Sequence, residues 1–322
     1  MTHKIVLLDN TAPAQADRLR TLLPTGFELS HATARGEEHL KASIRDADFA
    51  ISAQVAVTGD ILRAGSRLKL LHKWGVGIDN LDVDAARELN IKVARTTGSN
   101  AIPVAEFTIG LMLATLRFQS LAHERLRQGQ WTAFNELPGD TFCISGRTIG
   151  IVGFGAIGQT VARLLKGFDC TILYNKRDRL ASTREKELGV TFAPMPELLA
   201  SADIVSLHCP LTPATSNLID AEALSCMKST SVLINVARGG VVNEDDLALA
   251  LRNNVIRGAA MDVYSIEPLP GHSKLLGLDN IVLTPHLASA TADTFEPTVR
   301  RMFDNIARVS RGEPLPPDDQ VV

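Results

Sequence analysis

The sequence predicts an α/β fold with two doubly wound parallel-sheet domains, and three observations lead to it. The chain has 322 residues, about twice the usual size of one domain. Short apolar runs alternate with helical patterns, which is typical of parallel sheets covered by helices. A glycine-rich turn, Gly153-Phe154-Gly155-Ala156-Ile157-Gly158, follows an apolar run at mid-chain. A second α/β series therefore starts there, and the first hundred residues form a separate domain.

The apolar runs are regular enough to name the expected strands. In the first part of the chain we expect strands at Ile5–Leu8, Phe27–Leu29, Phe49–Ser52, Leu68–Lys73 and Ile91–Ala94. In the second part we expect them near residues 149–152, 171–174, 190–192, 203–207, 231–235, 257–261 and 281–284. The apolar, often β-branched composition of these runs is that of strands buried on both faces.

Two long helical patterns flank the second series of strands. Pro103 opens a helix that is expected to run from Val104 to about Arg127, with Ser99 or Asn100 as a candidate N-cap. The other helix is expected from about Thr291 to Val309.

The order of these elements predicts the domain boundaries. We expect residues 1–100 and 290–322 to form a substrate domain, with the last helix packed on it, and residues 101–289 to form a dinucleotide-binding domain. Pro314, Pro316 and Pro317 predict a loose tail after the last helix.

Composition argues against several classes of protein. There are 33 basic and 36 acidic residues, a formal net charge of −3, and this argues against nucleic acid as the main partner. The first apolar run stops at Asp9, so we expect neither a signal peptide nor a membrane span. We expect the cysteines to be reduced core residues of a cytoplasmic protein, because they lack metal-binding spacing. They are Cys143, Cys170, Cys209 and Cys226.

The glycine-rich turn predicts a dinucleotide site. It lies between a predicted strand and a helical pattern from Gln159 to Phe168, as a βαβ unit requires. The glycines permit a tight turn, close approach of the backbone to a pyrophosphate, and close packing of helix on strand. The alternative is a glycine turn without a ligand, which the flanking elements disfavour.

The end of the next strand indicates which dinucleotide is bound. Sites for NAD carry an acid there that accepts hydrogen bonds from the ribose, whereas this chain has Asn175, followed by Lys176, Arg177 and Arg179. An amide flanked by cations would accept a 2′-phosphate that a carboxylate would repel. We therefore expect NADP rather than NAD, and the alternative is a solvated basic loop.

Three polar residues follow predicted strands, where open α/β sheets place functional groups. They are Arg238, Glu267 and His286. An arginine fork binds a carboxylate, a histidine transfers a proton, and an adjacent glutamate would stabilise the imidazolium. Taken singly, each could be structural. Together, and downstream of the glycine turn, they indicate hydride-transfer chemistry.

The chain resembles the D-isomer-specific 2-hydroxyacid dehydrogenase family over most of its length. The resemblance rests on five ordered motifs: GFGAIG at 153–158, His208-Cys209-Pro210-Leu211, NVARGG at 235–240, Asp262 with Glu267-Pro268, and Thr284-Pro285-His286. It implies a Rossmann dinucleotide-binding domain inserted into a flavodoxin-like substrate domain, with catalysis in the cleft. It also implies a homodimer.

The resemblance implies roles for single residues. Arg238 would bind the substrate carboxylate, His286 would be the acid/base, and Glu267 would pair with it. In the first domain, the backbone of Val76 and Gly77 would hold the substrate carboxylate.

Cofactor contacts follow from the same resemblance. Asp262 would contact the nicotinamide side. The residues expected to line the rest of the cofactor are Gly153, Phe154, Gly155, Ala156, Ile157, Gly158, Asn175, Lys176, Arg177, Cys209, Val236 and Ala237.

One departure from the pattern of phosphoglycerate dehydrogenases narrows the class of substrate that we expect. Phosphoglycerate dehydrogenases usually carry an arginine for the phosphate where this chain has Ser52, so small 2-oxo acids such as glyoxylate or hydroxypyruvate fit better. Glu267 argues against formate dehydrogenases. Phosphoglycerate and phosphite dehydrogenases remain as alternatives. A binding protein of the dinucleotide-sensing corepressor type is a third, less favoured alternative.

Overall fold

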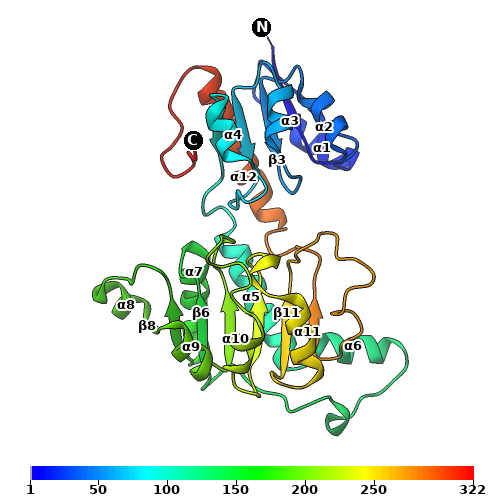
Figure 1. The fold of residues 1–322 in the computed structure, drawn as a ribbon, viewed down its shortest axis with the longest axis vertical. Coiled ribbons are helices and arrows are strands. Elements are labelled where there is room, and N and C mark those ends of the chain that lie inside the picture. The colour runs from blue at the N-terminus through cyan, green and yellow to red at the C-terminus, as the bar shows by residue number, and fades with distance from the viewer. Residues whose placement is uncertain (1) are drawn as a thin grey trace. The chain divides into compact units, whose positions relative to one another are not determined.

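The computed structural model describes residues 2–322, apart from the side chain of Phe134. The chain divides into two compact units: unit 1 is Met1–Asn100 with Ala290–Val322, and unit 2 is Ala101–Ser289. Each unit is built on a parallel sheet, as Figure 1 shows. The predicted fold class, α/β with two parallel-sheet domains, is confirmed.

Unit 1 holds a five-stranded parallel sheet in the order β2-β1-β3-β4-β5. Its strands are β1 (His3–Leu7), β2 (Phe27–His31), β3 (Phe49–Ser52), β4 (Leu70–Lys73) and β5 (Lys92–Ala94). One face is covered by α1 (Pro13–Arg20) and α12 (Ala292–Ser310). The other is covered by α2 (Glu37–Ile44), α3 (Gly59–Ala64) and α4 (Val83–Glu88).

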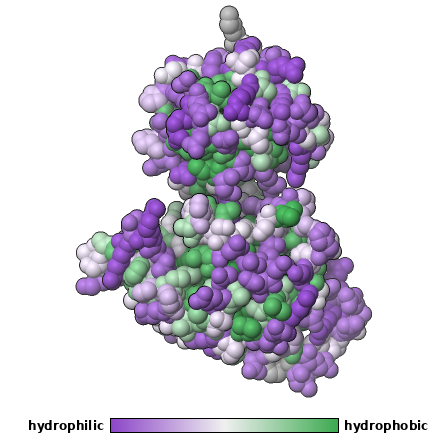
Figure 2. All heavy atoms as spheres, in the orientation of Figure 1, coloured by the Kyte–Doolittle hydropathy of each residue, from purple (hydrophilic) through white to green (hydrophobic). Residues whose placement is uncertain are grey.

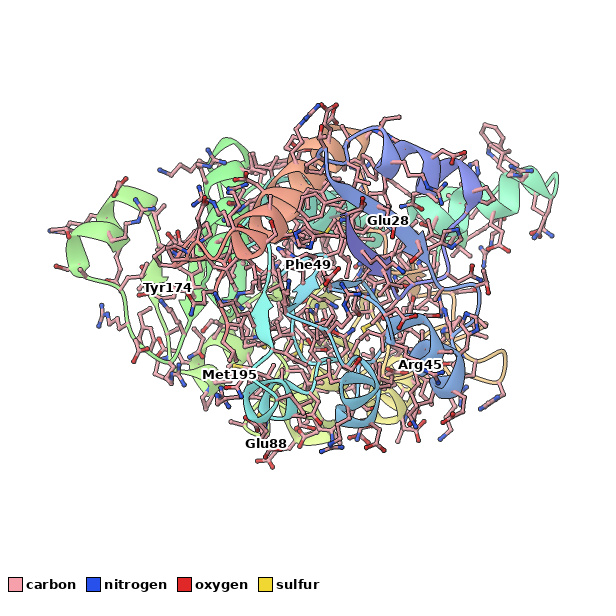
Figure 3. The ribbon with its side chains drawn as sticks, turned by 90° about the horizontal axis from the view of Figure 1, so that it is seen from above. Glu28, Arg45, Phe49, Glu88, Tyr174 and Met195 are labelled. Atoms are coloured by element: carbon pink, nitrogen blue, oxygen red, sulfur yellow. The ribbon has the colours of Figure 1, made fainter. Side chains whose placement is uncertain are left out.

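Side chains of β3 show how the two faces of this sheet are filled. Phe49 and Ile51 pack in the cluster that contains α12, and Ala50 packs in the opposite cluster. Phe49, labelled in Figure 3, is fully buried. The alternation follows from the two-residue repeat of a strand.

Unit 2 holds a seven-stranded parallel sheet in the order β12-β11-β10-β9-β6-β7-β8. Its strands are β6 (Thr148–Val152), β7 (Thr171–Asn175), β8 (Thr191–Phe192), β9 (Ile204–Leu207), β10 (Val232–Asn235), β11 (Gly258–Met261) and β12 (Ile281–Leu283). All twelve strands of the two sheets lie within two residues of the predicted ranges.

Helices cover both faces of the unit 2 sheet. Residues of α5 (Ala101–Leu116) and α7 (Ala156–Leu165) share one apolar cluster with the strands. Residues of α9 (Met195–Ser201), α10 (Ala221–Ser225) and α11 (Glu244–Arg252) share the other. The remaining elements are α6 (Gln119–Arg127), α8 (Ser182–Leu188) and the 3-10 turns η1 (Phe134–Glu136), η2 (Lys166–Phe168) and η3 (Gly239–Val241).

The single helix predicted from Val104 to Arg127 is wrong, because the structure has two helices, α5 and α6, bent by 67°. Phe118 at the break has a left-handed backbone with φ of 51°. Arg257 donates to the carbonyl oxygens of Thr115 and Leu116 and lies over the Phe118 ring. Arg257 therefore supplies hydrogen-bond donors to the carbonyl groups at the C-terminal end of α5.

The helix also starts at Ala101, before Pro103. The predicted N-cap is not observed: Ser99 donates its hydroxyl to the Thr96 carbonyl, and the buried Oδ1 of Asn100 has no hydrogen-bond partner among the described residues.

The predicted loose tail after the last helix is also wrong. Asp319 is fully buried and accepts hydrogen bonds from Arg301 (2.6 and 2.8 Å) and from Asn305 (3.0 Å). Gln320 forms an antiparallel bridge with Ala94. A buried carboxylate with its own arginine therefore anchors the segment that the prolines suggested was free.

The structure bears on two further expectations, one about the cysteines as reduced core residues and one about membrane spans. All four cysteines are free thiols, but Cys143 and Cys226 are exposed and are not core residues. No single helix among residues 2–322 is long and apolar enough to span a membrane, and α5 and α6 pass that test only when taken together.

Candidate active site

The glycine turn joins β6 to α7, and its three glycines have three different surroundings. A Cβ on Gly153, where φ is 88°, would overlap the backbone of His208 and Cys209. A Cβ on Gly158 would lie 2.5 Å from the Gly153 carbonyl oxygen. A Cβ on Gly155, the N-cap of α7, would meet nothing within 4 Å. The first and third glycines close the turn, and the second leaves open space at the helix N-terminus. These surroundings fit a bound pyrophosphate.

The rest of the predicted turn is part of the core or lies beside it. Phe154 is buried and its ring lies 4.5 Å from that of Tyr174. Cys209 is buried against the turn, and burial raises the pKa of its thiol. Ala156 and Ile157 are the first two residues of α7.

Asn175 ends β7 beside the glycine turn. The backbone N–H of Gly153 donates to the Asn175 carbonyl oxygen over 2.9 Å. The side-chain Nδ2 donates to the Ala193 carbonyl oxygen, also over 2.9 Å. With the amide nitrogen engaged, Oδ1 is the atom of this side chain that can accept from a ribose hydroxyl.

The basic residues after β7 have different surroundings. Arg179 donates to both oxygens of Glu185, which also accepts from the buried Tyr174 hydroxyl. Figure 3 labels Tyr174 within unit 2. The bonds from Arg179 and Tyr174 lower the pKa of Glu185.

By contrast, Arg177 is 94% exposed, and its nearest acid, Asp178, is 3.8 Å away. Hydrophilic side chains also gather over α8 in Figure 2.

Arg238, Glu267 and His286 lie at one edge of the unit 2 sheet. They follow β10, β11 and β12, which are parallel neighbours. Parallel strands bring their carboxyl ends to the same edge. The structure therefore brings together the three residues that the sequence predicted as a set.

Arg238 sits on a turn that its neighbours fix. Asn235 accepts from the Ala237 N–H and donates to the Arg238 carbonyl oxygen, each over 3.0 Å. The guanidinium of Arg238 donates to the Ala237 carbonyl oxygen over 2.7 Å. Val236 and Ala237, predicted to line the cofactor, are buried in this turn.

Glu267 and His286 form a hydrogen-bonded pair. Oε2 of Glu267 lies 2.8 Å from Nδ1 of His286, and Oε1 accepts from the Tyr264 N–H over 3.0 Å. Burial acts to raise the pKa of Glu267, but these bonds and the charges of His286 and Arg238 outweigh it and lower that pKa. Because an ionised carboxylate only accepts, Nδ1 of His286 is the donor, and Nε2 is the nitrogen left to exchange a proton.

Asp262 holds the segment that carries His286. Its carboxylate is fully buried and accepts from the Thr284 hydroxyl (2.6 Å), the Leu287 N–H (2.8 Å) and the Ala288 N–H (2.9 Å). A contact between Asp262 and a nicotinamide stays a prediction. The supporting role of this carboxylate was missed, although its place one residue after a strand was a usable signal.

The predicted substrate loop lies in unit 1, after β4. Gly75 has a φ of 132°, and its carbonyl oxygen accepts from the Thr96 N–H. Lys73, which ends β4, is buried and donates to the Ala53 carbonyl oxygen and to Oδ1 of Asn80. Lys73 therefore ties this loop to the one after β3, and substrate binding by Val76 and Gly77 stays a prediction.

Comparison with known proteins agrees with this geometry. The family model described as D-isomer specific 2-hydroxyacid dehydrogenase, NAD binding domain, matches residues 109–288. The glyoxylate reductase of Thermococcus onnurineus is 38% identical over 296 residues, which cover 90% of this chain and 87% of that protein. The D-3-phosphoglycerate dehydrogenase of Methanocaldococcus jannaschii is 35% identical over 94% of this chain and 57% of its own length.

The chain is also similar to a solved structure over nearly the full length of both. The NADPH-dependent glyoxylate/hydroxypyruvate reductase of Sinorhizobium meliloti, in complex with NADP and malonate, has a TM-score of 0.86 and 31% identity. The similarity covers 100% of this chain and 97% of that one. With the family model and the relatives above, it identifies this chain as a member of the D-isomer-specific 2-hydroxyacid dehydrogenase family, NAD(P)-dependent oxidoreductases that act on CH–OH groups.

Proposed function

We propose that the chain reduces glyoxylate, hydroxypyruvate or a similarly small 2-oxo acid to the D-2-hydroxy acid, with NADPH preferred over NADH. The observation that carries the proposal is the 2.8 Å pair of Glu267 and His286 at the same sheet edge as Arg238. The open space at Gly155 supports binding of the dinucleotide in the same unit.

Each of the three residues has one task in this mechanism. Arg238 binds the substrate carboxylate and orients the carbonyl group. His286 protonates the carbonyl oxygen from Nε2, while Glu267 holds Nδ1 and stabilises the charged ring before the proton leaves. When bound, the reduced nicotinamide supplies the hydride that the carbonyl carbon receives.

Three features support the preference for NADPH. Asn175 has no negative charge to repel a 2′-phosphate, and its amide is held in place by Ala193. Arg177 is almost fully exposed beside it. The similar reductase of Sinorhizobium meliloti is NADPH-dependent. Because Glu185 engages Arg179, we assign the phosphate contacts to Lys176 and Arg177.

The surroundings of Ser52 support a substrate without a phosphate group. Ser52 is fully buried and donates to the Val55 carbonyl oxygen over 2.7 Å. It stands where phosphoglycerate dehydrogenases carry an arginine, and a buried hydroxyl supplies no charge for a phosphate. The names of the glyoxylate and hydroxypyruvate reductase relatives agree with this substrate class.

We also propose that the chain forms a homodimer in the cytoplasm. Helix α6 buries none of its residues; Leu126 in its last turn and Trp131 in the segment that follows are 56% and 82% exposed. An apolar surface of this kind suits a second copy of the chain. The exposed free thiols of Cys143 and Cys226 suit a reducing compartment.

Loss of NADPH or NADH absorbance tests the proposal directly. The substrates are glyoxylate, hydroxypyruvate and pyruvate, with phosphohydroxypyruvate as the phosphorylated comparison. We expect the highest kcat/KM for a small unphosphorylated acid with NADPH. Reduction of phosphohydroxypyruvate alone, or oxidation of phosphite with NADP, would replace the proposed substrate. Absence of turnover with all of them would remove the enzyme assignment and favour a dinucleotide-sensing binding protein.

A further inference from the structure

The side chain of Tyr264 links the ends of two neighbouring strands. Its hydroxyl lies 3.0 Å from the Met261 carbonyl oxygen, at the end of β11, and 3.0 Å from the Thr284 carbonyl oxygen, just after β12. One hydroxyl proton is shared between two carbonyl groups. Glu267 follows the first of these strands and His286 the second.

The backbone of Tyr264 contacts the same site. Its N–H donates to Oε1 of Glu267 over 3.0 Å. Its carbonyl group packs against Gly239, where an added Cβ would overlap it. Gly239 follows Arg238 directly, so Tyr264 touches the segments that carry all three members of the predicted set.

We propose that Tyr264 is a positioning residue for the Glu267–His286 pair. Its hydroxyl holds the segments after β11 and β12 at a fixed separation, and this separation sets the distance between the carboxylate and the imidazole. The expected effect on turnover rests on the proposed function. The expected effect on the local structure of the two segments does not.

Two observations support the hydroxyl as a permanent donor. The residue is 8% exposed, so water does not replace these bonds freely. Burial, together with the charge of Asp262, raises the pKa of Tyr264 to about 12, so the group keeps its proton in neutral solution. Aromatic filling of the core would need neither the hydroxyl nor its two acceptors.

The chain supplies its own matched control. It has two tyrosines, and the other, Tyr174, is also buried in unit 2 with a bonded hydroxyl, 2.7 Å from Glu185. Tyr264→Phe and Tyr174→Phe therefore remove the same atom from two buried rings. Only the first removes it from the segments that carry Glu267 and His286.

The first test compares kcat of the two variants with glyoxylate at saturating NADPH. Tyr264→Phe is expected to lower kcat about three- to tenfold, the loss for one neutral hydrogen bond. KM for NADPH should not change. Tyr174→Phe, which loses a bond to the charged Glu185, should lower Tm at least as much and leave kcat within about twofold of wild type.

The second test is hydrogen exchange measured by mass spectrometry, and it needs no turnover. Tyr264→Phe is expected to speed exchange in residues 262–268 and 284–288 about three- to tenfold, because local opening becomes easier by the same free energy. If wild type reduces no 2-oxo acid, the proposed function fails while this measurement still decides the inference. Unchanged exchange in these segments, with kcat equal to wild type, would overturn it.

A third measurement covers the case in which Tyr264→Phe does not fold. In the Tyr174→Phe background, 3-fluorotyrosine gives one fluorine resonance, from position 264. We expect this resonance to move as Glu267 is protonated at acid pH, and to stay in place over the same range after Glu267→Gln. Equal movement with and without the carboxylate would show that Tyr264 is not coupled to Glu267, against the inference.

Discussion

The backbone N–H of His286 donates to the carbonyl oxygen of Asp262 over 2.8 Å. His286 has a left-handed backbone with φ of 55°, a conformation that side chains other than glycine adopt at a cost. The Asp262 carboxylate holds the residues on both sides of His286. One buried side chain therefore maintains the backbone geometry of the proposed acid/base.

Replacing Asp262 with asparagine should loosen the His286 segment. An amide has a single acceptor oxygen, and its NH2 group would face a backbone N–H of Leu287 or Ala288. We expect the free energy of unfolding to fall by about 1–3 kcal/mol, the cost of a buried unsatisfied group, and kcat to fall with it. Asp245→Asn, on an exposed pair with Lys274, should cost less than about 1 kcal/mol. Equal effects of the two changes would contradict this role of Asp262.

Replacing His286 with alanine should remove the proton donor and leave cofactor binding intact. We expect kcat for 2-oxo acid reduction to fall about 100-fold or more, the usual contribution of a positioned acid. The Kd for NADPH, measured by fluorescence, should stay near that of wild type, because the glycine turn lies at β6. Turnover equal to wild type would rule His286 out as the acid.

The Glu267–His286 pair should make the free energy of unfolding depend on pH, and the direction of that dependence follows from the pKa of Glu267. Its pKa is lowered from the ordinary value of 4.5 in the folded state. A lowered carboxylate pKa contributes stability above pH 4.5, and this contribution disappears as the pH falls through the folded pKa. We expect the difference in free energy of unfolding between wild type and Glu267→Gln to be largest near neutral pH and to shrink below pH 4.5. Urea unfolding at several pH values measures it, and a difference that grows on acidification would have the wrong sign.

Arg177→Ala separates the two cofactors. Loss of one charge-assisted bond to a 2′-phosphate should raise KM for NADPH about 10- to 100-fold and leave KM for NADH unchanged. Arg163→Ala removes another exposed arginine from the same unit, in the last turn of α7, and should change neither constant. A parallel rise for both cofactors would mean that Arg177 does not recognise the phosphate.

The strands and the grouping of Arg238, Glu267 and His286 were predictable because their signals are local. A buried parallel strand is an apolar run, and a polar residue just after it lies at the carboxyl edge of the sheet. The break at Phe118 was not predictable, since it depends on Arg257, far along the chain. The anchored tail likewise depends on distant residues, because Asp319 accepts from the Thr97 N–H and Gln320 forms a bridge with Ala94.

The contacts that support the site were missed for a related reason. The Tyr264 hydroxyl reaches the Thr284 carbonyl oxygen because β11 and β12 are neighbours in a fixed register. A sequence pattern predicts both strands, but it does not give their order in the sheet or their register. Polar contacts between strand ends depend on that order and on that register.

The burial of His72 in β4 predicts how acid changes the stability of unit 1. Its Nδ1 donates to the Lys73 carbonyl oxygen, and its Nε2 accepts from Asn305 over 3.1 Å. This arrangement needs a neutral ring. Burial lowers the pKa of His72 to about 4, although the Lys73 carbonyl and the charge of Asp319 act to raise it. Between this value and 6.5, its ordinary pKa, the unfolded chain binds a proton that the folded chain does not.

The free energy of unfolding of unit 1 should therefore fall as the pH falls from 6.5 towards 4, by about 2–3 kcal/mol in all. Replacing the exposed Trp131 with phenylalanine leaves Trp74, in unit 1, as the only tryptophan. Its fluorescence can then follow urea unfolding of this unit at each pH. His72→Asn in the same background should flatten the dependence over this range, because asparagine does not titrate. The same slope with and without His72 would mean that other groups cause the loss of stability in acid.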